Sequence, residues 1–448
     1  MDLDEFTERL FSIEKRLELF SDQSGGVPWW DAVRYHVHGF LFDSLVGAVP
    51  ALPLRRALPA RALGWAQRTA LRMLLHFRIA FFRYDTLILR AARQKDNGRP
   101  LDPGLDDVLA LCPGRALTID TFPHYFHLPA RGSRRRDVCV GEPTDRLLEA
   151  LRSEFGGSWD QSALRELIAV RLQDFQSALD AYRKLLARIR PRLIVITQNG
   201  MEKALFAAAR EAHIPLVEAQ HGLIGHSHAA YSYPRGADYG NHRTFPTVFL
   251  AFSEYWIRTC FYPADRCVPI GNNHFAIGAL PPPADPGAVM FVSGDLSHDV
   301  LREWAMRLAA TNPLRKIIYK LHPNQHGASR KIEEELSAFK NIEVIDASVS
   351  ARALLPRVGH VVLIQSTVTL GALQTGRRVC ILPFLHYQVH KDLFECAAVT
   401  VTPTLEDLIR ALDAPTDCGP PPSFFDRFDA AAASELLREL YDIAARAA

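Results

Sequence analysis

The sequence is poor in cysteine, and the spacing of its cysteines excludes two common kinds of site. The 448 residues include seven cysteines, an odd number that is scattered along the chain. No two of them have the CxxC spacing of a zinc ribbon or a redox dithiol. Runs of roughly 18 or more apolar residues are also missing, so we expect no membrane-spanning helix. The acidic start Met1–Phe6 differs from the basic start of a signal peptide. We therefore expect a cytoplasmic protein with free thiols.

Several enzyme motifs are missing as well. The sequence has no GxxxxGK[ST], which excludes a P-loop ATPase, and no GxGxxG after an expected strand, which leaves a nicotinamide site unsupported. It also lacks the GxSxG of serine hydrolases and the HExxH of zinc peptidases. We expect neither a cofactor nor a metal.

The composition is that of a globular protein: 48% of the residues are apolar, 23% are charged, and the net charge is +2. The length suggests two or three domains. One segment departs from this balance. Residues 51–100 hold eleven Arg or Lys and two Asp, a net charge of +9. Between Arg61 and Arg93 the cations alternate with apolar residues, as in a basic amphipathic helix.

Such a helix has two interpretations. It can dock on an anionic membrane surface, where each cation contributes about 1 kcal/mol, or it can be a solvated helix whose apolar side faces its own core. Nucleic-acid binding is the weaker prediction, because the segment lacks the spaced aromatic residues and known folds that support it.

From about residue 115 onward, short β-branched or aliphatic runs alternate with helical stretches. This pattern predicts βαβ units and parallel sheets. The expected strands are Ala116–Ile119, Leu193–Thr197, Leu216–Glu218, Val248–Phe252, Val289–Val292, Ile317–Leu321, Ile342–Ile345, Val361–Ile364, Val379–Leu382 and Val399–Val401.

These strands are too many for one ordinary sheet, so we predict an α/β protein with two Rossmann-like domains and a helical N-terminal extension. The predicted parts are a helical, basic extension over 1–110, an acceptor domain over 111–245 and a donor domain over 246–420. A C-terminal helix over 421–448 is expected to pack back on the acceptor domain. The proline-rich stretch Leu280–Pro286 is the expected hinge.

Polar residues follow two of the expected strands in the N-terminal half, at the edge where open α/β sheets bind ligands. Gln198 and Asn199 follow the strand 193–197, and Glu218, Gln220 and His221 lie at the end of the next strand, with His226 further on. An imidazole in a cleft can bond a sugar hydroxyl or carry a proton. A plain turn and a structural histidine are the alternatives. A metal is disfavoured, because no third ligand stands at a regular spacing.

Two loops in the C-terminal half favour a phosphate site. Lys320-Leu-His322-Pro323 ends one expected strand, and Gln365-Ser366-Thr367 ends another and begins a helix. A Lys and a His suit a phosphate, and leftover amides at a helix start attract one too. Ser366 and Thr367 as a mere helix cap are the alternative. Ser293 and Gly294, which follow a third strand, are expected to add a phosphate-facing loop.

The His322-Pro323 and Ser366-Thr367 pair resembles the HP and S-S/T motifs of bacterial GT-B glycosyltransferases, which include sialyl- and Kdo-transferases that use CMP-sugars. CDP-glycerol glycerophosphotransferases share a similar His-Pro signal. The segments Glu218–Gly222, Tyr231–Pro234 and Val27–Arg34 resemble parts of predicted capsule and lipopolysaccharide transferases. The resemblance implies that His322, Ser366 and Thr367 contact the donor phosphate and nucleotide. Together with the strand-end loops, this gives a predicted donor site of Lys320, His322, Pro323, Gln365, Ser366, Thr367, Ser293 and Gly294.

The sequence departs from that family at two points. Where a Glu often follows the Ser by five positions and binds the ribose, this chain has Gly371. A phosphoribosyl pyrophosphate donor needs no such Glu and stays an alternative to a CMP-sugar. No Asp/Glu-Asp/Glu-Gly motif is present either. The carboxylate candidates are Asp120, Glu202, Glu218 and Asp238, of which Glu218 and Asp120 rank first, with salt-bridged or capping roles as the alternative. The imidazole of His221 is the further catalytic candidate.

Three hypotheses follow. The first is a metal-independent glycosyltransferase that moves a sugar from an activated donor to a surface polysaccharide or lipid-linked acceptor, bound through Gln198, Asn199, Gln220 and His226. In it, residues 51–100 hold the enzyme at the inner face of the membrane. The second is a CDP-polyol phosphotransferase of teichoic-acid type. The third is a non-catalytic GT-B-like protein that binds glycans or lipids.

Overall fold

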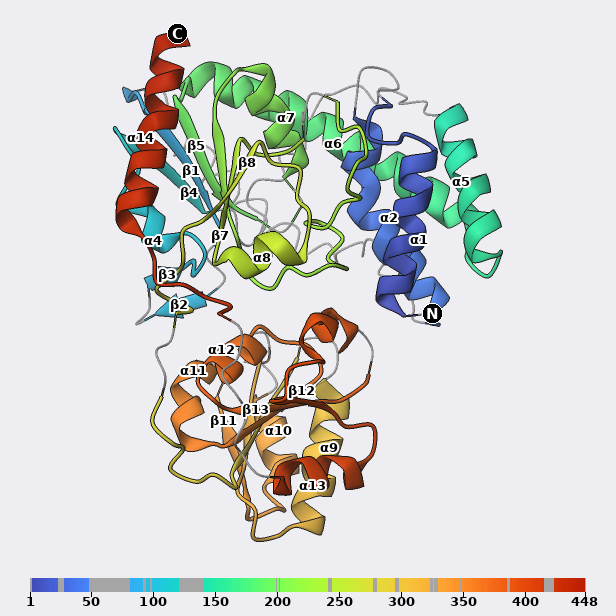
Figure 1. Cartoon of the computed structure of the whole chain (residues 1–448), viewed down its shortest axis with the longest axis vertical. Helices are drawn as coiled ribbons and strands as arrows, with labels where there is room; N and C mark the ends of the chain where they lie inside the picture. The colour runs from blue at the N-terminus through green and yellow to red at the C-terminus, as the bar shows by residue number, and fades with distance from the viewer. Residues whose placement is uncertain are drawn as a thin grey trace. The chain divides into compact units, whose positions relative to one another are not determined.

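The computed structural model describes most of the chain: residues 2–22, 28–47, 81–91, 94–96, 99–120, 141–198, 200, 202–240, 244–276, 280–294, 298–322, 325, 329–346, 348–384, 387–414 and 423–447. The chain divides into two units. Unit 1 consists of Met1–Ile270 and Asp429–Ala448, and unit 2 of Gly271–Phe428. Each has its own parallel sheet (Figure 1). The expected α/β class with two Rossmann-like units is confirmed.

Unit 1 is built on a six-stranded sheet in the order β4-β1-β5-β6-β7-β8. Its strands are β1 (Thr86–Arg90), β4 (Ala116–Asp120), β5 (Leu193–Thr197), β6 (Leu216–Ala219), β7 (Val248–Ala251) and β8 (Arg266–Pro269), and a short hairpin adds β2 (Gln94–Asp96) and β3 (Arg99–Leu101). Its helices are α1 (Leu3–Arg16), α2 (Trp29–Leu45), α4 (Asp106–Leu109), α5 (Gly141–Phe155), α6 (Gln161–Ile189), α7 (Lys203–Glu211), α8 (Glu254–Thr259) and α14 (Ala430–Ala447).

Unit 2 repeats the plan with the order β11-β10-β9-β12-β13-β14. Its strands are β9 (Val289–Val292), β10 (Ile317–Lys320), β11 (Ile342–Ile345), β12 (His360–Leu363), β13 (Arg378–Ile381) and β14 (Val399–Val401). Its helices are α9 (His298–Thr311), α10 (Ser329–Leu336), α11 (Ala351–Leu354), α12 (Val368–Gln374) and α13 (Leu405–Asp413), with the 3-10 turns η3 (Leu355–Arg357) and η4 (Tyr387–Leu393). This is the Rossmann strand order, and it reverses between β9 and β12.

The central strands form because their residues are apolar throughout. β5 reads Leu-Ile-Val-Ile-Thr with all five residues buried, as expected for a parallel strand covered on both faces. Helix α6 begins where the Asp160 side chain accepts bonds from the amides of Ser162 and Ala163. It ends at Ile189, and the C-cap residue Arg190 takes a left-handed conformation. Helices α6 and α7 supply core residues against β1, β4 and β5.

The first 110 residues differ from the expected helical extension. Residues 86–90 form β1, a fully paired strand between β4 and β5. The expectation of a basic amphipathic helix up to Arg93 is therefore wrong for residues 86–90, because the run Thr-Leu-Ile-Leu is buried inside the sheet. Residues 51–80, 92, 93, 97 and 98 of the basic segment lie outside the described part of the chain.

The division between the units also differs from the expected one at 245/246. Strands β7 and β8 join the first sheet, so unit 1 continues to Ile270. β8 was not expected, because Arg266-Cys-Val-Pro269 is short and lies at the sheet edge. Helix α14, red in Figure 1, belongs to unit 1, where the ring of its Tyr441 lies against the Arg192 guanidinium at 5.2 Å.

The expected hinge at Leu280–Pro286 is part of unit 2. The buried Arg377 guanidinium donates to the Pro281 carbonyl oxygen at 2.9 Å, and the Ala284 amide donates to that of Pro356 at 3.0 Å. The chain passes between the units next to Gly271 and Phe428 instead. Gly271 has φ +75°, and a Cβ there would lie 2.2 Å from the Arg427 carbonyl oxygen, so this crossing requires glycine.

Candidate functional site

Glu218 lies at the end of β6 in unit 1, inside a ring of hydrogen-bond donors. Its side chain is completely buried. Oε1 accepts from the Gln198 amide at 2.5 Å and contacts the Tyr231 hydroxyl at 2.7 Å, and Oε2 accepts from the Tyr262 hydroxyl at 2.7 Å. Both oxygens are therefore occupied within the protein, and the carboxyl group has no face toward solvent.

Burial and hydrogen bonding act in opposite directions on the protonation of Glu218. The Tyr231 hydroxyl donates toward two oxygens, the Gln198 carbonyl at 2.6 Å and Oε1 of Glu218 at 2.7 Å, so its one proton is shared between them. Burial raises the pKa of Glu218, while the Tyr and Gln donors and Lys203 oppose this shift.

Buried hydrogen bonds and an ion pair link helices α1 and α2 to the loop that follows β6. Arg34 of α2 pairs with Glu14 of α1, Nε to Oε1 at 2.5 Å, and both side chains are at most 1% exposed. Trp30 donates to the same carboxylate at 2.9 Å, and Arg34 also donates to the Ala229 carbonyl oxygen. Burial disfavours the charge of Arg34, but the Glu14 carboxylate outweighs it, so the pKa of Arg34 lies above its usual value.

Asp31 and Lys203 form a second buried ion pair in this region. Asp31 of α2 accepts from the Thr244 hydroxyl and lies 3.8 Å from Lys203 Nζ, which donates to the Thr244 carbonyl oxygen at 3.1 Å. The Lys203 ammonium also lies 4.0 Å from the centre of the Phe245 ring. Burial lowers the pKa of Lys203, and Asp31 opposes this shift. The segment Trp29–Arg34 therefore anchors the loops after β6 through its charged residues.

The remaining predicted residues of unit 1 differ in exposure. Gln220 is completely buried; its amide donates to the Gly222 carbonyl oxygen at 2.7 Å, and its oxygen accepts from the Phe252 amide at 2.9 Å. His226 pairs with Glu8 of α1 at 2.8 Å. His221 is half-buried, with its ring stacked on Tyr231 at 5.3 Å. Asn199 and the side chain of Asp120, the last residue of β4, lie outside the described residues.

In unit 2, the predicted donor residues follow three adjacent strands. β9 pairs with β10 on one side and β12 on the other, all parallel, so their carboxyl ends share one edge. Ser293 and Gly294 follow the middle strand, Lys320 and His322 one neighbour, and Gln365–Thr367 the other. Two strand spacings separate the outer loops by about 10 Å. This edge lies where the strand order reverses, the place at which such sheets bind ligands.

Lys320 and His322 occupy the β10 side of this edge. Lys320 is 4% exposed, and its ammonium donates to the carbonyl oxygens of Leu321 at 2.5 Å and Asp346 at 3.1 Å. Burial lowers the pKa of Lys320 to about 8, with Asp346 opposing the shift. The His322 amide donates to the Gln325 side chain at 2.8 Å, and the His322 side chain is half-buried. Pro323 lies outside the described residues.

The loop after β12 is more open. Gln365 and Ser366 are half-buried, and Thr367 is exposed. The Ser366 amide donates to Nε2 of His390 at 3.1 Å, and the Val368 amide donates to Oγ of Ser366 at 3.2 Å. The backbone amides at the start of α12 were expected to bind a phosphate. The amides of Ser366 and Val368 already have hydrogen-bond partners within the protein, so the expectation is not met for them. The hydroxyl groups of Ser366 and Thr367 remain the candidate donors.

Ser293 and Gly294 lie between these two loops. The Ser293 amide donates to the Lys320 carbonyl oxygen at 3.0 Å, and its side chain is 2% exposed. Among the described residues, no atom lies within 4 Å of a Cβ built on Gly294, so none of them fills the space beside it.

No pattern in the sequence pointed to Tyr262, Lys203, Glu14 or His390. Tyr231 and Arg34 lie in segments that resemble other transferases, but the resemblance implied no role for them. For α2, a local signal existed: Asp31 and Arg34 stand among Trp29, Trp30 and Val33, and all five are buried. An acid and a base inside an apolar helix indicate partners elsewhere in the core. His390 had no such signal, because it reaches Ser366 from 24 residues away.

Within the described residues, no group of three His, Cys, Asp or Glu side chains is placed to hold a metal ion, and no helix is long and apolar enough to cross a bilayer.

No family model matches the chain, and no curated protein is similar to it in sequence. Solved structures with similarity include UDP-GlcNAc 2-epimerase of Methanocaldococcus jannaschii, at 12% identity and TM-score 0.47 over 79% of this chain and 98% of that one. S. aureus MnaA with UDP has 10% identity and TM-score 0.48 over 82% and 97%. Glycosyltransferase VinC with dTDP has 16% identity and TM-score 0.42 over 80% and 95%. Similarity at this level carries no activity over to this chain.

Proposed function

We propose that the protein is a metal-independent GT-B glycosyltransferase that moves a sugar from an activated phosphate donor to a glycan or lipid-linked acceptor. One observation carries this proposal: the loops after β9, β10 and β12 place Ser293–Gly294, Lys320–His322 and Gln365–Thr367 at one sheet edge, at the reversal of strand order. A donor phosphate suits this edge, because it offers an ammonium group, an imidazole and hydroxyls.

In the proposed reaction, an acceptor hydroxyl oxygen bonds to the anomeric carbon while the bond from that carbon to the donor phosphate oxygen breaks. The phosphate leaves with the bonding electrons, and its charge is stabilised by fixed donors. The Lys320 ammonium group donates two of its three protons to the carbonyl oxygens of Leu321 and Asp346. Its third proton is the one proposed to bind the phosphate. The hydroxyls of Ser366 and Thr367 supply further donors.

The acceptor hydroxyl must lose its proton. Of the leading catalytic candidates whose side chains are described, His221 is part-exposed and Glu218 is enclosed. We assign proton removal to His221 and a positioning role to Glu218, which holds the Tyr231 ring on which His221 stacks.

The donor is proposed to be a CMP-sugar, such as a CMP-linked Kdo or sialic acid, from the sequence resemblance. A screen of CMP-, CDP- and UDP-linked donors and phosphoribosyl pyrophosphate tests this by the nucleotide or pyrophosphate released. Release of CMP from a CDP-alcohol would favour the polyol phosphotransferase instead. Epimerisation of the donor sugar without any acceptor would contradict transfer.

The variant His322→Ala tests the site. We expect its kcat/KM for the donor to fall about 10- to 100-fold with little change in melting temperature. The control is His213→Ala, an exposed histidine on the turn after α7, which should keep wild-type turnover. Unchanged turnover in His322→Ala would refute the assigned role. Ligand-induced stabilisation without any product would favour a non-catalytic binding protein.

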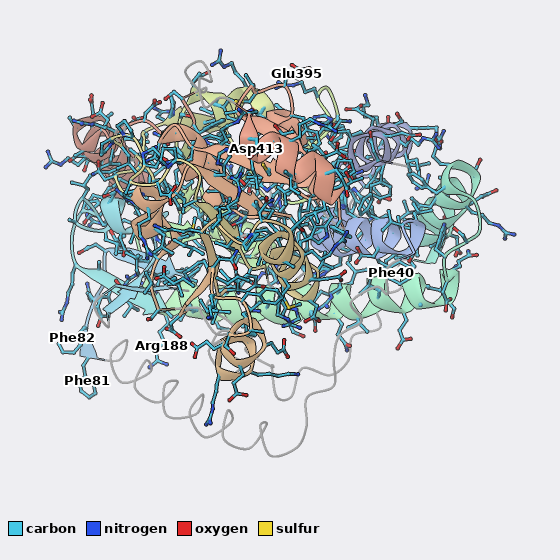
Figure 2. All side chains as sticks on the ribbon, turned by 90° about the horizontal axis from the view of Figure 1, so that it is seen from below. Phe40, Phe81, Phe82, Arg188, Glu395 and Asp413 are labelled. Carbon is cyan, nitrogen blue, oxygen red and sulfur yellow. The ribbon has the colours of Figure 1, made fainter. Side chains whose placement is uncertain are left out.

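We further propose that unit 1 touches an anionic membrane at the amino-terminal edge of its sheet. Phe81 and Phe82, just before β1, are 68% and 43% exposed, and Figure 2 shows both projecting from the ribbon. The Arg115 guanidinium lies 4.3 Å from the Phe82 ring centre, and the Arg192 amide donates to the Asp85 carbonyl oxygen. Aromatic rings among cations are typical of interfacial contacts.

Vesicle sedimentation tests this contact. We expect wild-type protein to bind phosphatidylglycerol vesicles more strongly than phosphatidylcholine vesicles, and the double variant Phe81→Ser, Phe82→Ser to bind both weakly. Leu314→Ser is the matched control, because Leu314 is 98% exposed but lies in unit 2, next to Arg315, which is paired with Asp413. Equal binding by the wild type and the double variant would exclude this surface.

A further inference from the structure

The buried side chain of His390 is hydrogen-bonded to the loop after β12. It lies in η4 and is 1% exposed. Its Nε2 accepts the Ser366 amide at 3.1 Å and lies 3.4 Å from the Thr369 hydroxyl. One buried ring therefore contacts both the serine that follows β12 and the first turn of α12.

The contact fixes the protonation of the ring. A backbone amide only donates, so Nε2 carries no proton and the single ring proton sits on Nδ1. Burial lowers the pKa of His390 to about 4, which keeps the ring neutral at pH 7. Nδ1 has no hydrogen-bond partner within the described part of the chain. An apolar side chain at position 390 would bury no unsatisfied N–H group. The presence of an imidazole is therefore explained by the hydrogen bond that its Nε2 accepts from the Ser366 amide.

Ser366 is fixed by two contacts that leave one proton available. Its amide points inward to His390, and its Oγ accepts from the Val368 amide at 3.2 Å. Because Oγ is an acceptor in that contact, its own hydroxyl proton is left to donate to a ligand. The serine side chain is half-buried, so a ligand at the sheet edge has access to it.

We propose that His390 is a positioning residue that orients the Ser366 hydroxyl toward a phosphate of the donor. This inference rests on the proposed function, because it assigns His390 to the same phosphate site. His390 itself does not touch the donor; it acts through the Ser366 backbone.

Three variants test the inference. His390→Ala removes the acceptor, and we expect the KM for the donor to rise about 10-fold while kcat stays within about twofold. His390→Gln offers an amide oxygen to the Ser366 amide and should restore much of the affinity. The matched control is His360→Ala: His360 is also 1% exposed, but it begins β12, at the opposite end of the strand from Ser366. It should lose stability without a change in donor KM.

The outcomes separate the two proposals. If the wild type turns over a donor and His390→Ala keeps the wild-type KM, or if His390→Ala and His360→Ala raise it equally, the positioning role is overturned and the proposed function stands. If the wild type neither turns over nor binds CMP, CDP, UDP or pyrophosphate in calorimetry, both fail. Nitrogen-15 NMR gives a readout independent of activity, and a proton on Nε2 of His390 at pH 7 would overturn the inference.

Discussion

The two units place polar residues after the strands of similar sheets, but they use them differently. In unit 1, Glu218, Gln198 and Gln220 are at most 5% exposed, and their polar atoms bond to one another and to the surrounding loops. In unit 2, Ser293 and Lys320 are equally buried, but Gln365 and Ser366 are half-buried and Thr367 is exposed. The same sequence signal thus produced an internal network in unit 1 and, in unit 2, an edge that is accessible on its β12 side.

This difference in exposure distinguishes residues that hold loops in place from residues that can contact a ligand. A side chain whose hydrogen-bond capacity is used up inside the protein holds loops in place, and one that keeps unused donors near solvent can bind a ligand. Unit 1 has its supporting network around Glu218 and Arg34, with His221 at its boundary. Unit 2 has a smaller support, His390, beneath Ser366.

The largest effect is expected for Arg34→Ala. This change leaves the Glu14 carboxylate buried without its partner, which costs about 3–5 kcal/mol of unfolding free energy. Calorimetry should show a lower melting temperature, and hydrogen exchange should increase in α1, α2 and the loop near Ala229. The control Arg183→Ala breaks an exposed pair with Glu211 and should cost less than about 1 kcal/mol. Equal losses in the two variants would contradict the supporting role of Arg34.

Glu218 gives the next largest effect. Glu218→Ala leaves the donors of Gln198 and Tyr262 without an acceptor and should cost about 3 kcal/mol, measured by urea unfolding. Glu218→Gln resembles the neutral acid and should cost about 1 kcal/mol. If Glu218→Gln instead kept full stability and lost all turnover, Glu218 would be catalytic, as the sequence suggested.

Acid should weaken unit 2 through His360. Burial lowers the pKa of His360 to about 4 from the usual 6.5. Between these values the unfolded chain binds a proton that the folded chain does not, so stability falls as the pH falls from 6.5 to 4. The expected loss from pH 7 to pH 5 is about 2 kcal/mol. His360→Leu should remove this part of the pH dependence in urea unfolding; an unchanged slope would show that His360 titrates normally.

The smallest effect is expected for Lys320, at the carboxyl edge of the unit 2 sheet. Because Lys320 has a pKa of about 8, it is charged below this pH and neutral above it. If it holds a donor phosphate, the donor KM should rise a few-fold between pH 7 and pH 9. Lys320→Arg keeps its charge over this range and should flatten the profile. A wild-type KM that does not change with pH would remove Lys320 from the phosphate site and make the two units more alike.

The sequence predicted much of the sheets because parallel strands are apolar along their whole length. β5, β9, β11 and β14 have the expected bounds, and β4, β6, β7 and β10 differ by one residue at their last position. β12 and β13 begin and end one residue earlier than expected. β1 was missed, since its arginine neighbours gave it the pattern of a basic helix. The Pro281 segment was read as a hinge, because a local pattern cannot show that Arg377 holds it in unit 2.

The candidate site was predictable only as a set of loops. Lys320, His322 and Ser366 were found because polar residues follow apolar strands, and the strand order then placed them at one edge. The burial of Gln198, Gln220 and Glu218 was not predictable, because it depends on Tyr231, Tyr262 and the helices α1 and α2, which are distant in sequence.

The sequence by itself determined most strands of the two sheets and the polar loops that follow them, because apolar runs and the residues next to them are local features. Only the tertiary structure decided which polar groups face solvent and which are enclosed. The reason is physical: exposure and hydrogen-bond partners are set by residues far along the chain, as Arg34 meeting Glu14 and His390 meeting Ser366 show.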